Sequence, residues 1–400
     1  EQDLTQLVSS TLGGDDNTTT TTSNNASSSL SSLGIDSLHA VKIASMIKSK
    51  YQVDVPLKML FAPTANLADL STFIMSKQQG GTSNSNNNNH LQQVQQQTNI
   101  ADQVQICMKD FAAFAATQSF DKNKPTSCIP LKKSQIKYML LTGCTGFLGS
   151  FLLFDLLQAY CTNSSTHVII YCIVRAKNNQ LAQERVIESL LEHKLIEQLQ
   201  ACNKHATVDE TLNWLHVHVK ALAGDCGMSD MMGLAPSDYK LLQDNVQVIF
   251  HNAAHVNALL GYEQLKSSNV TATLNVLKLA YATSSGELNK HVYHISTIGV
   301  VQGFKQEISL EESVPLEIHN AILSSASGYS QSKFVAEMLV HQVAAQYHIP
   351  TIVFRPGMIG PDTVNGMGND NDWVVRLIRG CIMLGYYPDT NHRIRLDTSK

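Results

Sequence analysis

The stretch IKYMLLTGCTGFLGS, residues 136–150, decides the fold of the larger part of the chain. It begins as an apolar run of strand length and continues with Gly143, Gly146 and Gly149 at intervals of three. Between a strand and a helix, such glycines allow a tight turn, let backbone approach a pyrophosphate and pack helix against strand. The N–H groups at the helix start then bind phosphate. We therefore predict a dinucleotide site whose phosphate loop comprises Gly143, Thr145, Gly146, Phe147, Leu148 and Gly149.

Strand and helix patterns alternate from this stretch onward. Strands are predicted at residues 136–143, 167–176, 214–225, 246–254, 291–301 and 350–357, with helices at 147–160, 180–195, 265–281 and 333–347. Such alternation is typical of a parallel sheet with helices on both faces. We expect an α/β Rossmann-type, doubly wound parallel-sheet domain over residues 136–400, after a poorly defined lead-in segment at 101–135. His216 and His218 alternate along the third predicted strand, and we interpret them as edge or core residues of the sheet.

The end of the second strand indicates which dinucleotide is bound. An acidic residue there binds the ribose 2′-hydroxyl of NAD, whereas an arginine accommodates the 2′-phosphate of NADP. The strand ends in YCIVRAKN, with Arg175 and no acid, so we predict NADP(H). Asp225, after the third strand, is placed either to contact the adenine or to cap the next helix.

Tyr329 and Lys333 lie four residues apart in GYSQSKFVAE and share one face of a predicted helix. A free tyrosine has a pKa near 10, and a neighbouring ammonium favours its phenolate. This brings the hydroxyl toward the range useful for acid–base chemistry. The preceding strand ends in HISTIGV, so Ser296 or Thr297 could hydrogen-bond a substrate carbonyl beside the tyrosine.

The N-terminal part differs in composition and in predicted secondary structure. We expect a small all-α four-helix domain over residues 1–76, interrupted by a disordered Thr/Ser/Asn-rich insertion at about 13–32. A low-complexity linker at 77–100 follows. Within SSLGIDSLHA, residues 31–40, Ser37 stands at a predicted helix start. It either caps that helix or carries a phosphodiester that the helix N-terminus favours.

The motifs after residue 136 resemble the extended short-chain dehydrogenase/reductases, above all the thioester reductase domains that end polyketide and non-ribosomal peptide synthases. The resemblance implies that Thr297, Tyr329 and Lys333 carry the hydride chemistry. It places further residues at the cofactor or its neighbourhood, namely Arg175, Asp225, Asn252 and Arg355 with the phosphate loop. Such domains carry a larger C-terminal substrate region, so we expect this domain to be truncated there.

LGIDSL and LFAPTANLADL resemble acyl carrier protein domains, which implies a covalent 4′-phosphopantetheine on Ser37. Together the two resemblances predict part of a polyketide synthase that releases an acyl thioester with NADPH as an aldehyde or alcohol. The implied partners are the acyl thioester substrate, a phosphopantetheinyl transferase and upstream synthase domains. One alternative is a fatty acyl-CoA reductase or sugar-modifying dehydrogenase. The other is a redox-inactive NADP-binding scaffold or sensor.

Composition narrows these possibilities further. The formal net charge of −4 gives no reason to expect nucleic acid, and no apolar run predicts a membrane span. The eight cysteines form no CxxC pair, so we expect free thiols and a cytoplasmic location. His251 and His255 are spaced as zinc ligands, but the glutamate after the first histidine is missing. We therefore predict no metal site.

Overall fold

The computed structural model describes the following parts of the chain: residues 43–44, 46–48, 50–51, 53, 55, 57–60, 66–79, 100–118, 131–162, 167–228, 231–257, 259–282, 290–301, 327–370, 372–387 and 396–398. The chain divides into two compact units. One unit comprises Glu1–Gln97, Asn257–Gly261 and Ser327–Tyr329; the other comprises Thr98–Val256, Tyr262–Ala326 and Ser330–Lys400.

The first unit contains α3 (Leu57–Leu60) and α4 (Leu67–Gln79). The side chain of Asn66 caps α4, because its Oδ1 accepts the N–H of Asp69 at 2.8 Å. A small core is buried here, formed by Ile43, Ile47, Val53, Val55, Leu60, Leu67, Leu70 and Ile74. Ser37 and the predicted insertion lie outside the described residues, as does most of the linker. The four-helix arrangement therefore stays a prediction.

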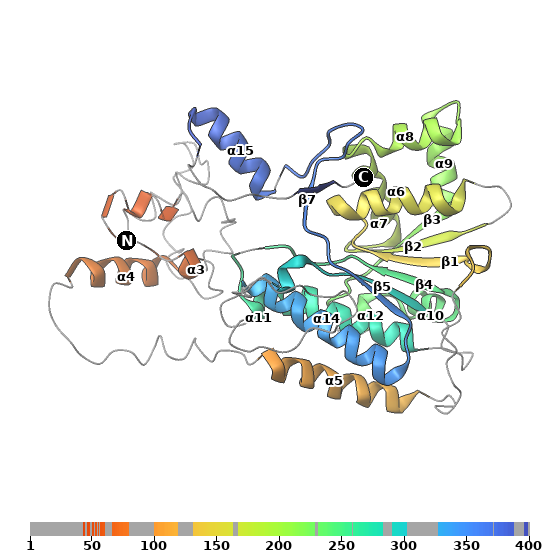
Figure 1. The fold of residues 1–400 in the computed structure, drawn as a ribbon, viewed down its shortest axis with the longest axis horizontal. Helices are drawn as coiled ribbons and strands as arrows, with labels where there is room; N and C mark the ends of the chain where they lie inside the picture. The colour runs from red at the N-terminus through yellow and green to blue at the C-terminus, as the bar shows by residue number, and fades with distance from the viewer. Residues whose placement is uncertain are drawn as a thin grey trace. The chain divides into compact units, whose positions relative to one another are not determined.

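The second unit is built on a parallel sheet of six strands (Figure 1). The strands are β1 (Tyr138–Thr142), β2 (Ile169–Val174), β3 (Val219–Ala223), β4 (Val248–His251), β5 (His291–Ile295) and β6 (Thr351–Phe354). Their order is β3-β2-β1-β4-β5-β6, which confirms the predicted Rossmann-type sheet. The order reverses direction between β1 and β4, and ligands of such sheets bind at this point.

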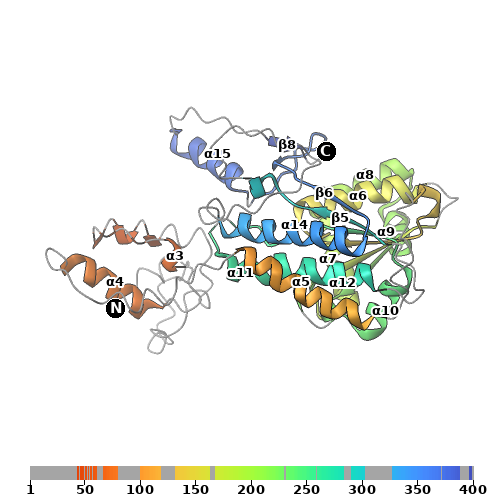
Figure 2. The ribbon, with the colours of Figure 1, turned by 60° about the horizontal axis from the view of Figure 1, so that its bottom comes forward.

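Helices cover both faces of the sheet (Figures 1 and 2). One layer contains α6 (Phe147–Cys161), α7 (Asn179–Glu192), α8 (Leu195–Asn203) and α9 (Val208–His218). The other contains α5 (Ile100–Thr117), α10 (Pro236–Asn245), α11 (Tyr262–Lys266), α12 (Ala272–Tyr281) and α14 (Gly328–Tyr347). Successive residues of a strand face opposite sides, so Leu140 joins the second layer's core while Met139 and Leu141 join the first.

Helix α5 occupies the segment for which the sequence predicted no element. Phe111 on this helix is fully buried. Its ring makes edge-on contacts with the rings of Tyr281 on α12 and Tyr347 on α14, at centroid distances of 5.6 and 4.8 Å. An aromatic cluster of this kind buries a large apolar area, so α5 is an integral part of the second unit.

The predicted third strand is wrong in its first half, because residues 208–218 form helix α9 and only 219–223 form β3. A reciprocal cap starts the helix: Thr207 Oγ1 accepts the N–H of Glu210 at 3.2 Å, and Glu210 Oε2 accepts the N–H of Ala206 at 2.7 Å. His216 and His218 therefore lie on a helix and not on a strand. The buried His218 ring donates from Nδ1 to the carbonyl of Val168 at 2.8 Å.

The last described segment follows β6 and includes α15 (Trp373–Leu384) and a small parallel pair, β7 (Met358–Gly360) and β8 (Leu396–Thr398). Large apolar side chains are exposed on α15 and just after it: Trp373, Leu377, Ile378, Ile382, Met383, Leu384, Tyr386 and Tyr387. Within the described residues, no helix combines the length and apolar character required to cross a membrane.

Candidate active site

The glycine loop connects β1 to α6 at the reversal point of the sheet. Gly143 has φ +72°, and a Cβ at this position would lie 2.8 Å from Ala253 Cα. A Cβ at Gly149 would lie only 1.9 Å from the carbonyl oxygen of Gly143. Helix α6 starts with Gly146 as N-cap and no side-chain cap, so its first-turn N–H groups have neither intrahelical nor side-chain acceptors. A pyrophosphate fits this cradle.

Residues after β4 hold the glycine loop in place. Asn252 Nδ2 donates to the carbonyl oxygen of Gly143 at 3.2 Å, and the N–H of Ala253 donates to Thr142 Oγ1 at 3.1 Å. The structure thus brings Asn252, one of the predicted cofactor residues, into contact with the phosphate loop.

His251, the last residue of β4, lies beside Thr142, which directly precedes the glycine loop. Its Nδ1 lies 2.9 Å from Thr142 Oγ1 and its Nε2 lies 3.0 Å from Thr273 Oγ1. Burial, with a smaller contribution from Lys333, lowers the pKa of His251 to about 3, so the ring is neutral at physiological pH. Across the described part of the chain, no three His, Cys, Asp or Glu side chains come together in a group that could hold a metal.

Arg175 follows β2 directly and is exposed. Its carbonyl oxygen accepts a hydrogen bond from the guanidinium of Arg185 on α7. A second arginine therefore lies beside the backbone of Arg175, and no sequence motif marks this residue. Asp225 Oδ1 accepts the N–H of Gly227 at 2.9 Å and so shapes the turn after β3.

Helix α14 carries the predicted acid–base pair. Tyr329 lies in its first turn, and Lys333 follows one turn later with only 1% of its surface exposed. Lys333 Nζ donates to the carbonyl oxygen of Ile295 at 2.7 Å and lies 3.5 Å from His294 Nε2. Burial lowers the pKa of Lys333 to about 8, and the negative charge of Glu337 opposes this shift.

The two hydroxyls after β5 have different environments. Ser296 is buried, and its Oγ donates to Glu337 Oε2 at 2.5 Å. Thr297 is half-buried, and its Oγ1 accepts the N–H of Gly299 at 3.1 Å, which leaves the threonine proton to donate. Glu337 Oε1 also accepts from Arg355 Nε and Nη2, at 2.9 and 2.5 Å. The guanidinium of Arg355, another predicted cofactor residue, is thus bound by a buried carboxylate that we did not predict.

A π-helical segment, η5 (Ser267–Thr271), lies between α11 and α12. Its buried Asn269 accepts the N–H of His255 at 2.7 Å through Oδ1 and donates to Ser332 Oγ at 2.9 Å through Nδ2. Asn269 thereby joins the segment after β4 to α14. Such π-segments are frequent at functional sites, and the helical pattern of the sequence did not reveal this one.

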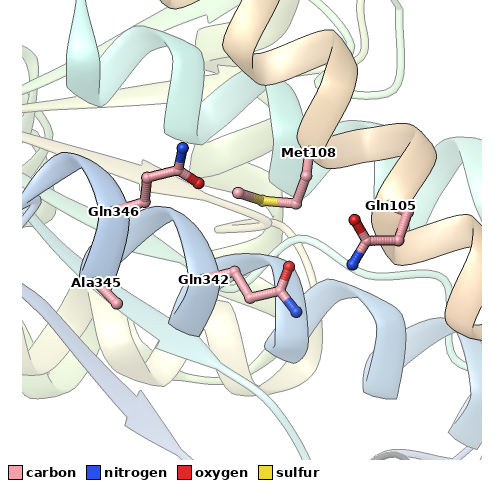
Figure 3. A pocket seen from close by; sticks show the side chains of 5 residues that line it. All are labelled: Gln105, Met108, Gln342, Ala345 and Gln346. Carbon is pink, nitrogen blue, oxygen red and sulfur yellow. The ribbon is translucent and has the colours of Figure 1, made fainter.

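A pocket between α5 and α14 is lined by Gln105, Met108, Gln342, Ala345 and Gln346 (Figure 3). Its amides and thioether supply no acid, base or nucleophile. Gln342 also lies nine residues beyond Lys333, about 13 Å along the helix axis. This pocket is therefore separate from the candidate active site.

The strand order, the glycine loop and the lysine of α14 beside the end of β5 define a Rossmann-type reductase domain. A family model described as "Male sterility protein" matches residues 141–398, and one described as "Phosphopantetheine attachment site" matches residues 2–74. The chain belongs to the first family. It combines a carrier domain with a thioester reductase domain, as predicted, and the two matches imply a phosphopantetheine group and a nicotinamide cofactor.

Curated relatives come from both peptide and polyketide synthases. The chain is 35% identical over 253 residues to the nonribosomal peptide synthetase asaC of Aspergillus flavus, and 29% identical over 287 residues to the probable polyketide synthase 38 of Dictyostelium discoideum. The matches cover 62% and 64% of this chain. They cover only 22% and 9% of those relatives, so the chain corresponds to a small part of each.

Solved structures show the same domain types. The terminal R domain from the myxalamid PKS-NRPS pathway is 30% identical with a TM-score of 0.57, covering 72% of this chain and 66% of that one. A thiolation-reductase di-domain from an archaeal non-ribosomal peptide synthetase covers all of this chain and 72% of its own, at 20% identity and a TM-score of 0.58. At that identity the second likeness concerns the fold alone.

Proposed function

We propose that this chain carries an acyl group as a thioester on a phosphopantetheine arm at Ser37 and releases it with NADPH, as part of polyketide biosynthesis. The observation that carries the proposal is the buried Lys333, one turn after Tyr329 on α14, whose Nζ donates to the carbonyl of Ile295, two residues before Thr297. A carrier domain in the same chain supplies a thioester for such a site.

The phosphate loop and its neighbours would hold the coenzyme. The N–H groups at the start of α6 bind the pyrophosphate, and Arg175, with Arg185 beside it, binds the 2′-phosphate. Asp225 contacts the adenine. Asn252 holds the glycine loop through the carbonyl of Gly143, and Arg355 binds Glu337 near the end of β5. When bound, the nicotinamide supplies a hydride to the thioester carbonyl carbon.

The chain's own residues supply the proton and the orientation. The Tyr329 hydroxyl donates its proton to the carbonyl oxygen as the hydride adds, which gives a hemithioacetal. The Thr297 hydroxyl donates a hydrogen bond to the same oxygen. Lys333 supports the tyrosine through its positive charge. The hemithioacetal then collapses: its O–H proton passes to sulfur, the C–S bond breaks, and an aldehyde and the pantetheine thiol leave. A second reduction of the aldehyde would give an alcohol.

Thr297, and not Ser296, is the hydroxyl that serves the substrate. The Ser296 proton is already donated to Glu337, a charged acceptor at 2.5 Å, and hydrogen bonds to charged groups are the stronger kind. This contact favours the threonine, a choice that the sequence left open.

The test follows NADPH oxidation by the chain after a phosphopantetheinyl transferase has loaded Ser37 with an acyl group. We expect turnover in wild type and in Ser296→Ala, and at least a hundredfold loss in Tyr329→Phe and in Thr297→Val. Ser37→Ala should gain no arm by mass spectrometry and should show no turnover of loaded substrate. Unimpaired turnover by Tyr329→Phe would contradict the catalytic assignment.

A separate comparison addresses the coenzyme. We expect NADPH to bind at least tenfold more tightly than NADH, and Arg175→Ala to remove most of this preference. Equal use of NADH and NADPH by wild type would overturn the role of Arg175. Product analysis by mass spectrometry distinguishes aldehyde from alcohol, and acyl groups from peptidyl groups as substrates.

A further inference from the structure

Glu337 is a fully buried carboxylate that no sequence motif assigned to the site. None of its side-chain surface is exposed. Its Oε2 accepts from Ser296 Oγ at 2.5 Å, and its Oε1 accepts from Arg355 Nε and Nη2 at 2.9 and 2.5 Å. His341 Nε2 lies 3.5 Å from Oε1, at the distance of an ion pair. A charge buried this deeply persists only when paired and hydrogen-bonded, and here both conditions are met.

These contacts join three segments around the proposed site. Ser296 directly precedes Thr297 at the end of β5, and Arg355 directly follows β6. Glu337 itself stands on α14 four residues after Lys333 and eight after Tyr329, so all three side chains share one helical face. A shift of the carboxylate would therefore move the ends of both strands relative to the helix.

The same carboxylate is the negative charge nearest in sequence to Lys333. Burial raises the pKa of the Glu337 carboxyl, but contacts from His341, Arg355 and Ser296 outweigh burial and leave the pKa below its ordinary value. Glu337 is thus ionised at neutral pH. Among the described residues, the other titratable groups near Lys333 include Tyr329 one turn earlier on α14, His294 on β5 and His251 on β4. Burial lowers the pKa values of both histidines, so neither ring carries a charge that could replace that of Glu337.

We propose that Glu337 is a positioning residue of the reductase site: it holds Ser296 away from the substrate, fixes Thr297 and Lys333 relative to each other, and places a negative charge one helical turn from Lys333. This inference rests on the function proposed above. It assigns Glu337 no contact with substrate or coenzyme, and its effect passes through the residues that it binds.

Glu337→Gln tests this role, because the amide keeps the shape while it removes the charge and replaces one of the two acceptor oxygens with a donor. We expect kcat to fall roughly tenfold to a hundredfold, the loss that a small misplacement of a catalytic group causes, with KM for NADPH within about threefold of wild type. The alkaline limb of the kcat–pH profile should move to lower pH, because Lys333 loses the charge that opposes its deprotonation. Glu337→Asp keeps the charge, so the alkaline limb of its kcat–pH profile should lie at the wild-type pH.

Two controls separate positioning from simple damage to the fold. Asp362→Asn neutralises another buried carboxylate, which accepts the N–H groups of Val364, Asn365 and Met367 in a loop and should leave the alkaline limb unmoved. Thermal unfolding of each variant gives its folded fraction at the assay temperature. A loss of kcat that matches the folded fraction, with an unmoved limb, would overturn the proposal.

The wild-type assay distinguishes the two levels of inference. If wild type does not oxidise NADPH with the loaded carrier, the proposed function fails and this inference fails with it. If wild type turns over and Glu337→Gln keeps its kcat and its pH profile, only the positioning role is wrong.

Discussion

Replacing Gly149 with alanine tests the packing that makes the phosphate loop. An alanine Cβ would lie 1.9 Å from the Gly143 carbonyl oxygen, 2.7 Å from its carbon and 2.9 Å from Asn252 Nδ2. Real Cβ contacts essentially never fall below 3.0 Å, so the separation from the oxygen must grow by about 1 Å. That carbonyl cannot move alone, because it accepts both the N–H of Gly146 and the Asn252 amide, each at 3.2 Å.

The expected cost follows from two opposing effects. Overpacking costs about 1–3 kcal/mol or more, while alanine in a helix recovers up to about 1 kcal/mol relative to glycine. Since the clash is with backbone, we expect a net loss of about 1–3 kcal/mol in the free energy of unfolding. For a domain of this size, that lowers Tm by roughly 2–10 °C. The displaced loop should also bind NADPH at least tenfold more weakly.

Gly146→Ala is the matched control. Its Cβ would lie 3.5 Å from the nearest heavy atom, the Gly143 oxygen, which is an ordinary contact. The poorer N-cap should cost less than about 1 kcal/mol, although a Cβ here would hinder the close approach of a pyrophosphate. Differential scanning fluorimetry measures Tm, and NADPH fluorescence measures binding. If Gly149→Ala keeps the wild-type Tm, or if both variants lose the same stability, the steric reasoning is wrong.

Three further outcomes are expected. Gly143→Ala should lower Tm and NADPH affinity together, because φ is +72° and its Cβ would lie 2.8 Å from Ala253; an unchanged melting curve would contradict this. Phe111→Ala should cost about 3–5 kcal/mol in urea unfolding, since a fully buried ring is lost between α5 and its neighbours; a cost below 1 kcal/mol would show that α5 packs loosely. Lys333 has a folded pKa of about 8 against 10.5 for a free lysine, so the unfolded chain binds more protons between these values and stability rises with pH there. In Lys333→Met, the rise of the free energy of unfolding with pH should be smaller by up to about 3 kcal/mol. The rise due to Lys290 should persist, because burial also lowers the pKa of that lysine to about 8. Identical pH–stability curves for wild type and variant would refute the assignment.

Local patterns were enough to predict the sheet and its phosphate loop. Each predicted strand contains an apolar run, and three glycines between the first strand and a helix are typical of a phosphate-binding turn. The same local patterns failed at residues 214–218, where apolar and polar residues alternate as in a strand. The cap formed by Thr207 and Glu210, seven and four residues earlier, makes this segment helical.

Interactions between distant segments could not be predicted in this way. We predicted no helix at the position of α5, and its place in the core depends on Tyr281 and Tyr347, more than 150 residues away in sequence. The contact between Arg185 and Arg175 spans only ten residues, yet it requires α7 to fold back along β2.

The residues alone predicted a Rossmann-type dinucleotide site with a tyrosine–lysine pair, because glycine spacing, the pair and strand length are properties of short segments. The thioester reductase and the carrier domain were implied by resemblance to known families. Tertiary structure decided which hydroxyl after β5 remains to donate, and which carboxylate accepts from the other hydroxyl and from Arg355. Ser296 and Thr297 are adjacent and chemically alike, so only the position of Glu337, 41 residues from Ser296 in sequence, distinguishes them. Glu337 reaches Ser296 only when α14 packs on the sheet. In that buried environment an unpaired charge is costly, so the carboxylate must be hydrogen-bonded.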